Sequence, residues 1–286
     1  MPATNMQLIK ELRERTGVGF GDCKKALAEA GWEMEEAIAI VRRESGAKAA
    51  KKADRTAAEG LLGVVASADG ERAAIVEINI ETDFAAKNEK FVAFVAEAAE
   101  RTLAEGAEGI AEALEGRRAE LVAEIGENIN VRRAARVEAP GGTVGVYLHQ
   151  DSRQGALVGL TVGDADLARD LAMHITAMRP LVVAPADVPE ATVARERAIF
   201  EAQAAESGKP ANIVEKMVEG RVRKFLAESS LTEQPFVKDA QVRISKLLKQ
   251  ANATCTGFER FQVGEGVEKQ EEDFAAEVAA QVEKSA

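Results

Sequence analysis

An internal repeat with a spacing of 82 residues constrains the fold of this chain more than any other feature. Gly63-Val64-Val65 is matched 82 residues later by Gly145-Val146-Tyr147, and Ala74-Ile75-Val76 is matched at the same spacing by Ala156-Leu157-Val158. Each copy has two apolar, strand-like runs separated by a polar turn, followed by a helical pattern near 84–104 or 166–179. The repeat predicts two similar structural units.

Both copies continue in the same way. The first has a second helical pattern, which includes Leu114 and Leu121, and then an alternating strand over 129–137. The second ends with a helix containing Val242, Leu247 and Leu248 and a strand over 254–263. Each copy therefore predicts a ββααβ unit, an antiparallel sheet with helices on one face, and the fold class is α+β. We expect the two core subdomains to span 56–140 and 141–185 with 231–263.

Three further regions surround this core. Residues 1–55 predict three short helices, the first capped by Thr4, the second capped by Asp22 and the third beginning near Glu33, which lead into a basic linker or helical tether. Residues 186–230 interrupt the second copy and predict an antiparallel helical hairpin. We expect the hairpin to serve self-association, and a docking arm is the alternative. The C-terminal module, 264–286, predicts an amphipathic helix with Phe274 and Val278 on its apolar face.

Charge and hydropathy narrow the function classes. The net charge of −11 argues against direct binding of nucleic acid, and no apolar run approaches the ~20 residues of a membrane span. The two cysteines, Cys23 and Cys255, are far apart in sequence and predict buried thiols in a reducing, cytoplasmic compartment.

The turn Thr82-Asp83-Phe84 contains the most unusual placement of a side chain. Thr82 and Asp83 are good N-cap residues, so Phe84 falls near the first helical position, where side chains usually face solvent. Phe84 is either a hydrophobic staple against its own core or a wedge that enters another protein. The second copy has Asp166 at the same place, so the scaffold does not require an aromatic ring there. The residues alone leave both interpretations open.

Equipment for bond chemistry is not evident. No Cys/His cluster has the spacing of metal ligands, and no phosphate-binding or nucleophile motif occurs, so we expect no catalytic residues, no metal and no cofactor. His174 falls within a helical apolar stripe and is predicted to be buried, while His149 ends a strand. The glycine corner Val18-Gly19-Phe20 is the exposed candidate of the three-helix region. These features indicate an interaction protein.

Several motifs resemble those of bacterial elongation factor Ts, and they occur in order along nearly the whole chain: Leu12-Arg13-Glu14-Arg15-Thr16-Gly17, Asp22-Cys23-Lys24-Lys25-Ala26-Leu27, Thr82-Asp83-Phe84-Ala85-Ala86-Lys87, Ile125-Gly126-Glu127-Asn128-Ile129-Asn130, Lys216-Met217-Val218-Glu219-Gly220-Arg221 and Val263-Gly264-Glu265-Gly266. The resemblance implies a UBA-like N-terminal module, a two-part core, an inserted hairpin and a C-terminal module. It also implies guanine nucleotide exchange on elongation factor Tu.

The resemblance assigns partner contacts to individual residues. Phe84 is implied to enter the GTPase domain, and Asp83 to disturb the Mg²⁺ and phosphate environment. The implied wedge residues are Thr82, Asp83, Phe84, Ala85 and Lys87. The other implied contacts are Arg13, Val18, Gly19, Phe20, Ile125, Leu148 and His149.

Two departures and two rival interpretations accompany this assignment. Gly21 and Ala85 stand where the family often has bulkier apolar residues, which reduces contact at the first position and support at the second. The rivals are a ubiquitin-like or peptide-binding scaffold, which would leave nucleotide release unchanged, and an enzyme that uses His149 with a nearby carboxylate.

Overall fold

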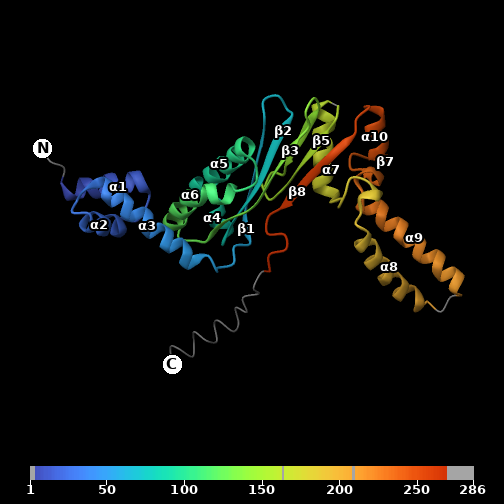
Figure 1. Cartoon of the computed structure of the whole chain (residues 1–286), viewed down its shortest axis with the longest axis horizontal. Coiled ribbons are helices and arrows are strands. Elements are labelled where there is room, and N and C mark those ends of the chain that lie inside the picture. Colours follow the sequence, from blue (N-terminus) through green and yellow to red (C-terminus); the bar gives the residue numbers. More distant parts are fainter. Residues whose placement is uncertain (1–3, 163, 208–209, 269–286) are drawn as a thin grey trace.

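A computed structural model describes residues 4–162, 164–207 and 210–268. The protein is elongated, with a three-helix unit at one end, a layered core in the middle and a helical hairpin at the other end (Figure 1). The α+β class predicted from the sequence is confirmed. The tail helix predicted around Phe274 lies outside the described residues. None of the described helices is long and apolar enough to cross a membrane.

Two three-stranded antiparallel sheets form the centre of the core. The first has the order β1-β2-β3, with β1 at Glu59–Ala66, β2 at Arg72–Ile80 and β3 at Ile129–Glu138. The second has the order β4-β5-β8, with β4 at Thr143–Leu148, β5 at Gln154–Leu160 and β8 at Cys255–Gln262. In each unit the second strand is central, because the third strand returns beside it rather than beside the first.

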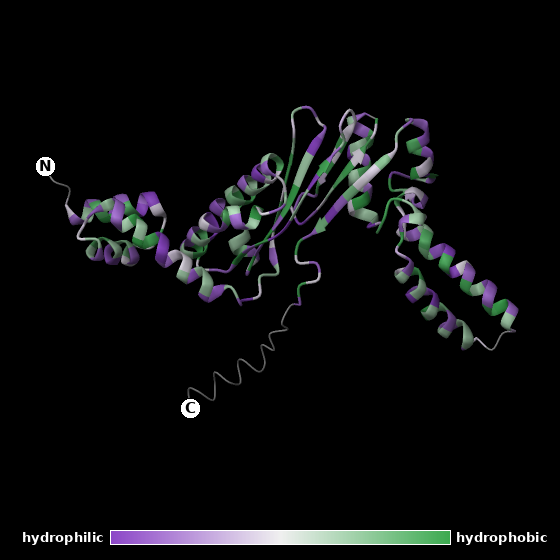
Figure 2. Cartoon of the chain, in the orientation of Figure 1, coloured by the Kyte–Doolittle hydropathy of each residue, from purple (hydrophilic) through white to green (hydrophobic). Residues whose placement is uncertain are grey.

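The layers of the core are helices, sheet, sheet and helices. Helices α5 (Glu89–Glu105) and α6 (Ile110–Ile125) pack on the first sheet, and α7 (Ala165–Met178) and α10 (Ile244–Gln250) pack on the second. The opposite faces of the two sheets meet in a shared apolar cluster, to which Ile75 and Leu157 contribute. Strand β2 is therefore buried on both faces, which explains its nearly continuous apolar sequence. Figure 2 shows the hydrophobic character of these strands.

A glycine of the repeated motif has the same structural reason in both units. A Cβ atom on Gly63 in β1 would lie 2.6 Å from the carbonyl oxygen of Val95 in α5, and one on Gly145 in β4 would lie 2.1 Å from that of Ala168 in α7. Both distances are shorter than a non-bonded contact allows. The repeated glycine therefore lets a helix backbone approach its sheet closely.

A β-bulge also recurs at the 82-residue spacing. In the first sheet the register shifts between Glu77 and Ile78, and in the second it shifts between Gly159 and Leu160. A bulge places two residues of one strand opposite one residue of its neighbour. The first bulge places Arg132 and Arg133 opposite Glu77, while the second occurs at a glycine.

The N-terminal unit consists of α1 (Asn5–Thr16), α2 (Phe20–Glu29) and α3 (Met34–Lys52). Thr4 forms a capping box with Gln7, as its position predicts. The prediction for α2 is wrong at its start, because Gly19 is the N-cap and Asp22 lies in the first turn. Helix α3 continues through the basic segment and packs against α6, which joins this unit to the core.

The inserted hairpin consists of α8 (Glu190–Ala205) and α9 (Ala211–Ser229), which pack on each other through Ala204, Val218 and Val222. It projects from the end of the second sheet (Figure 1). Short 3-10 turns flank it at Pro185–Asp187 and Leu231–Glu233. A small hairpin of β6 (Pro235–Phe236) and β7 (Asp239–Arg243) follows, so the prediction that Val242 lies in a helix is wrong.

Candidate functional site at an exposed aromatic turn

The candidate site is the turn that follows the central strand of the first sheet. Thr82 is extended (φ −123°, ψ 153°), and its hydroxyl accepts a hydrogen bond from the Ala85 amide at 3.2 Å, which starts the single turn of α4 (Asp83–Ala86). Asn88 then starts α5 by accepting from the Lys90 amide at 2.9 Å. The one helix predicted near 84–104 is therefore two helices, because Asn88 provides a second N-cap.

Phe84 is the most exposed of the large hydrophobic side chains in the described part of the chain, at 81% of its full accessible area. Its neighbour Ala86 supplies the buried contact of this turn, and the aromatic core of the first unit is made by Phe91 and Phe94. A hydrophobic staple requires the side chain to pack on its own molecule. The structure excludes that interpretation for Phe84.

Charged groups flank the exposed ring. The ammonium of Lys87 lies 3.1 Å from a carboxylate oxygen of Asp83 and 5.6 Å from the centre of the Phe84 ring. Both charged side chains are largely exposed, so their pairing contributes little to stability. The turn therefore presents an apolar ring, a carboxylate and an ammonium together to solvent.

Two carboxylates hold this turn against the corner between α6 and β3. Glu127 accepts hydrogen bonds from the Thr82 amide at 2.9 Å and the Thr82 hydroxyl at 2.8 Å. In the opposite direction, Glu81 accepts from the Asn128 amide at 2.5 Å. Sequence reasoning missed both carboxylates, since 45 residues separate Glu127 from Thr82. The only signal available in the sequence was that an acidic residue lies close to the end of each of the two chain segments, Glu81 on one and Glu127 on the other.

The predicted contacts on the N-terminal unit differ in exposure. Arg13 and Gly19 are exposed, and Phe20 is exposed at 46%. Val18 is exposed at only 2% and packs in the core of the three helices. The expectation that the whole glycine corner is exposed is therefore wrong for Val18, because its apolar side chain closes the unit beneath that corner.

The remaining predicted contacts lie on the core. Ile125 is half-buried at the end of α6 and packs against the cluster under the first sheet. Leu148 is half-buried and contacts the cluster between the sheets. His149 follows it, exposed, with its Nδ1 atom 3.0 Å from the Tyr147 hydroxyl. The structure thus places these residues at the end of α6 and at the β4–β5 turn.

The buried titratable side chains have structural surroundings. His174 is fully buried, with Nε2 2.9 Å from Gln234 Oε1 and Nδ1 accepting from the Val237 amide at 3.2 Å; its burial lowers its pKa, which the Gln234 contact partly offsets. Burial raises the pKa of Cys23, and raises that of Cys255 to about 11. Within the described residues, no group of three His, Cys, Asp or Glu side chains could hold a metal ion.

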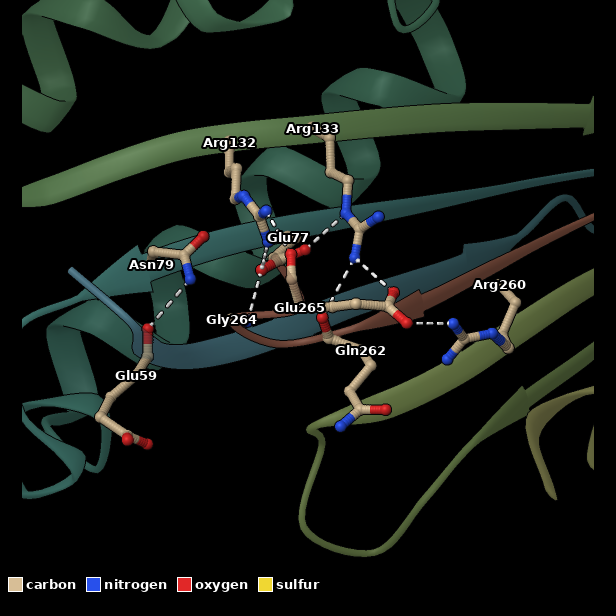
Figure 3. A network of polar contacts seen from close by, with 9 residues as sticks. All are labelled: Glu59, Glu77, Asn79, Arg132, Arg133, Arg260, Gln262, Gly264 and Glu265. Atoms are coloured by element: carbon tan, nitrogen blue, oxygen red, sulfur yellow. Dashed lines mark hydrogen bonds and ion pairs between the residues drawn. The ribbon is translucent and has the colours of Figure 1, made fainter. Parts of the chain in front are cut away.

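A buried ionic network, also missed by sequence reasoning, links the two halves of the core (Figure 3). Glu77 is fully buried and lies 2.9 Å from Arg132 Nη1 and 2.6 Å from Arg133 Nε. It also accepts from the Gly264 amide at 2.8 Å, just beyond the end of β8. Glu265 adds contacts to Arg133 and Arg260. The chain leaving the second sheet is thereby fastened to the first.

Comparison with known proteins decides which family carries this arrangement. A family model described as "Elongation factor TS" matches residues 81–265. The chain is 51% identical over 284 residues to an elongation factor Ts of Saccharophagus degradans, with 98% of each chain covered. It is 51% identical to one from Teredinibacter turnerae, covering 98% and 97% of the chains, and 50% identical to one from Hahella chejuensis, covering 99% of each.

The chain belongs to the elongation factor Ts family. The resemblance inferred from its motifs is thus confirmed, and the protein has a role in translation elongation. The elongation factor Ts match begins at Glu81, next to the exposed turn, and ends at Glu265, within the ionic network. The three N-terminal helices precede this match, but the full-length elongation factor Ts relatives cover them.

Proposed function

We propose that this protein binds elongation factor Tu carrying GDP and accelerates release of the nucleotide by inserting the Asp83-Phe84 turn into the GTPase domain. The observation that carries the proposal is the exposure of Phe84, at 81%, on a capped turn in a member of the elongation factor Ts family. An apolar ring held in solvent has no role in its own fold. Burying it in a partner recovers the hydrophobic free energy that its exposure forgoes.

The mechanism is a thermodynamic linkage between two ligands of the GTPase. If the bound factor stabilises a conformation with poor metal and phosphate contacts, it lowers nucleotide affinity, and the nucleotide lowers the affinity for the factor by the same ratio. Phe84 supplies the insertion, and the Asp83 carboxylate repels the phosphates or competes for their surroundings. Loss of Mg²⁺ removes the main neutralisation of the diphosphate, so GDP leaves faster. No residue of this chain makes or breaks a bond.

Additional contacts supply affinity. Arg13, Gly19 and Phe20 dock on the GTPase domain, with Phe20 as the apolar contact because Val18 is buried. Ile125 lies near the wedge, and Leu148 with His149 contacts another part of the partner. Thr82, Ala85 and Lys87 complete the wedge turn itself.

The proposed organisation follows from this function. A UBA-like module at 1–55 and the C-terminal module at 264–286 add contacts to the GTPase domain. Two duplicated ββααβ subdomains, 56–140 and 141–185 with 231–263, carry the wedge and the second contact; their shared strand order, glycine and bulge support duplication. The hairpin at 186–230 serves self-association, with a docking arm as the alternative. The protein acts in the cytoplasm without binding nucleic acid or membrane.

Release of labelled GDP from elongation factor Tu tests the proposal. The wild-type protein should accelerate release, and Phe84→Ala should lose about 30-fold of that acceleration, the effect of removing an interface hot spot of about 2 kcal/mol. Leu181→Ala is a matched control, because Leu181 is another exposed apolar side chain, at 63%, that is not among the proposed contacts.

Circular dichroism should show the same fold in all three proteins. Equal acceleration by wild type and Phe84→Ala would contradict the wedge. Binding of elongation factor Tu without any change in GDP release would favour the rival peptide-binding scaffold. Retained release in Phe84→Ala together with loss on His149→Ala would favour a site around the histidine.

A further inference from the structure

The corner Gly126-Glu127-Asn128 has contacts that a simple helix-to-strand connection does not need. The Glu127 carboxylate accepts from both the amide and the hydroxyl of Thr82, at 2.9 and 2.8 Å. The Thr82 hydroxyl in turn accepts from the Ala85 amide at 3.2 Å. The three groups form a series of hydrogen bonds, from the Ala85 amide to the Thr82 hydroxyl and from that hydroxyl to Glu127. Phe84 lies in the short backbone loop between Thr82 and Ala85 that this series closes.

This series of hydrogen bonds fixes the direction of the Thr82 hydroxyl hydrogen, which would otherwise be free to rotate. A threonine hydroxyl that only caps a helix can direct its hydrogen to solvent in several ways. Here the hydrogen points to Glu127, and hydrogen bonds to an ionised carboxylate are roughly twice as strong as those between neutral groups. The cap of the turn that carries Phe84 is therefore stronger than Thr82 alone would make it.

The corner that carries Glu127 is itself held from the other side. The Asn128 side chain donates to the carbonyl oxygens of Ala53 and Arg55, at 3.2 and 2.7 Å, and Lys52 donates to that of Gly126. Gly126 is left-handed (φ 89°) and ends α6, so the direction of the backbone at Glu127 is set. The end of α3 thus fixes the corner, and the corner fixes the turn.

In the second sheet unit, the hydrogen bonds that join the chain after β5 to the chain before β8 are made by two threonines. There Thr161, after β5, donates its amide to Thr254 O at 3.0 Å, and the Thr254 amide donates to the Thr161 hydroxyl at 3.1 Å. Thr161 lies three residues before the Asp164 cap, at the place of Asn79 in the 82-residue repeat. Joining the two segments therefore does not require a carboxylate, and the carboxylates occur in the unit whose turn exposes an aromatic ring.

We infer that Glu127 is a positioning residue for nucleotide exchange: it holds the Thr82–Ala85 turn so that Phe84 is presented in one orientation. The inference rests on the proposed function, because it assigns the orientation of the wedge to a residue outside the wedge. Fixing the turn beforehand removes an entropy cost that insertion of the ring in the bound complex would otherwise incur. Glu127 acts through Phe84 and is not itself required to touch the partner.

Hydrogen exchange of the free, full-length protein tests the first part of this inference. In Glu127→Ala, the backbone amides of Thr82 and Ala85 should exchange at least about tenfold faster, because their local opening is no longer opposed by the carboxylate. The rest of the first unit should keep its protection. Glu105→Ala is the control, since Glu105 pairs with Arg101 at the other end of α5, about 24 Å away by helix rise. Unchanged amide exchange in Glu127→Ala would overturn the inference, whatever the release assay shows.

The release assay tests the second part. Glu127→Ala should lower the maximal rate of GDP release about tenfold while changing the half-saturating concentration little, because the other contact surfaces are intact. Glu127→Gln, which keeps an acceptor oxygen, should lose less. In the Phe84→Ala background, Glu127→Ala should cause no further loss, since the group that it positions is gone.

The possible results separate the two proposals. If Glu127→Ala reduces release by the same factor with and without Phe84, Glu127 does not act through the ring and the inference is wrong, while the wedge stands. If Phe84→Ala itself keeps full activity, the proposed function fails and the role of Glu127 in release fails with it. The hydrogen-exchange result then still decides whether Glu127 orders the turn.

Discussion

The two sheet units place a capped turn after the same strand, but they expose different side chains on it. In the first unit the Thr82 cap is followed two residues later by Phe84, exposed at 81%. In the second, Asp164 caps α7 by accepting from the Leu167 amide at 2.6 Å, and Asp166 follows two residues later. The cap is what the fold requires, and the residue after it is free to differ. A functional side chain could therefore arise on one copy without disturbing the scaffold.

The recurring bulge shows a second difference of the same kind. The first unit has the fully buried Glu77 there, opposite Arg132 and Arg133, and the second has Gly159 opposite Thr256 and Gly257. Glu77 in the first unit binds the segment that follows β8. Because β8 belongs to the second unit, that unit needs no charged group to hold this segment. The first unit thus carries both the ionic network that holds the chain end and the turn that we propose acts on a partner.

The largest expected effect is on the ionic network. Glu77→Ala should lower the free energy of unfolding by about 3 kcal/mol, because removing one partner of a buried ion pair leaves the arginines uncompensated. Denaturant unfolding followed by circular dichroism measures this. Gly159→Ala, at the equivalent bulge, tests the comparison from the other side: its Cβ would lie 2.5 Å from Thr256 Oγ1, so it should destabilise by crowding instead. An unaltered midpoint in Glu77→Ala would mean that the network contributes no net stability.

Exchanging the two turns tests the comparison most directly. Replacing Asp83-Phe84 with the Ala-Asp of the second turn, while keeping the Thr82 cap and its hydrogen bond to Glu127, should reduce acceleration of GDP release by about 30-fold. The free energy of unfolding should change by no more than about 0.5 kcal/mol, because the Thr82 cap is unchanged and the two replaced positions are exposed. A protein that kept its exchange activity after this replacement would show that the two turns are functionally equivalent.

The cap of the second turn has a smaller effect. Asp164→Ala should cost about 1 kcal/mol of stability, the usual contribution of an N-cap side chain, and should leave GDP release unchanged. Thr82→Ala should cost a similar amount of stability but should also slow release, because the same side chain connects Glu127 to the wedge. Thermal unfolding and the release assay on both variants separate the two roles. Slowed release in Asp164→Ala would contradict the assignment of exchange to the first unit.

The smallest expected effect is a pH dependence of the free energy of unfolding, and it arises in the second unit. Burial lowers the pKa of His174, so the unfolded chain binds a proton there more readily than the native protein does. Stability from this group is therefore fully present above about pH 6.5 and falls as the pH decreases below that value. The free energy of unfolding, measured from pH 8 down to pH 5, should decline less steeply in His174→Gln than in the wild-type protein. Position 92, 82 residues earlier, is an exposed Val, so Val92→Ala should leave the pH dependence unchanged.

Sequence reasoning located most of the core because the signals are local. The repeat, the alternation of apolar residues and the glycines at turns predicted the strands of both units, the hairpin and the three N-terminal helices. It did not predict that the two sheets pack face to face, because alternation shows which residues are buried but not what covers them. The nearly continuous apolar run of β2 was the available sign that both of its faces are buried.

The candidate site also has features that the local sequence could predict and features that it could not. The Thr82 cap follows from residue type and position, so it could be predicted. The exposure of Phe84 could not, since a staple and a wedge have the same local sequence. Glu127 and Glu77 were missed because their partners are 45 residues or more away in sequence, and nothing local marks either carboxylate. Contacts of this kind follow from the sheet register, which only the structure supplies.

The pairing of β5 with β8 has a consequence for the order in which the protein is made. The first sheet can close once residue 138 has left the ribosome, but the central strand of the second must wait for residues 255–262. Until then the apolar cluster between the two sheets, to which Ile75 and Leu157 contribute, is incompletely covered. Exposed apolar surface of this kind promotes aggregation. A truncation before β8 should therefore yield insoluble protein, whereas one after Glu265 should remain soluble. Synthesis of the last strand is the step that completes the body of the molecule.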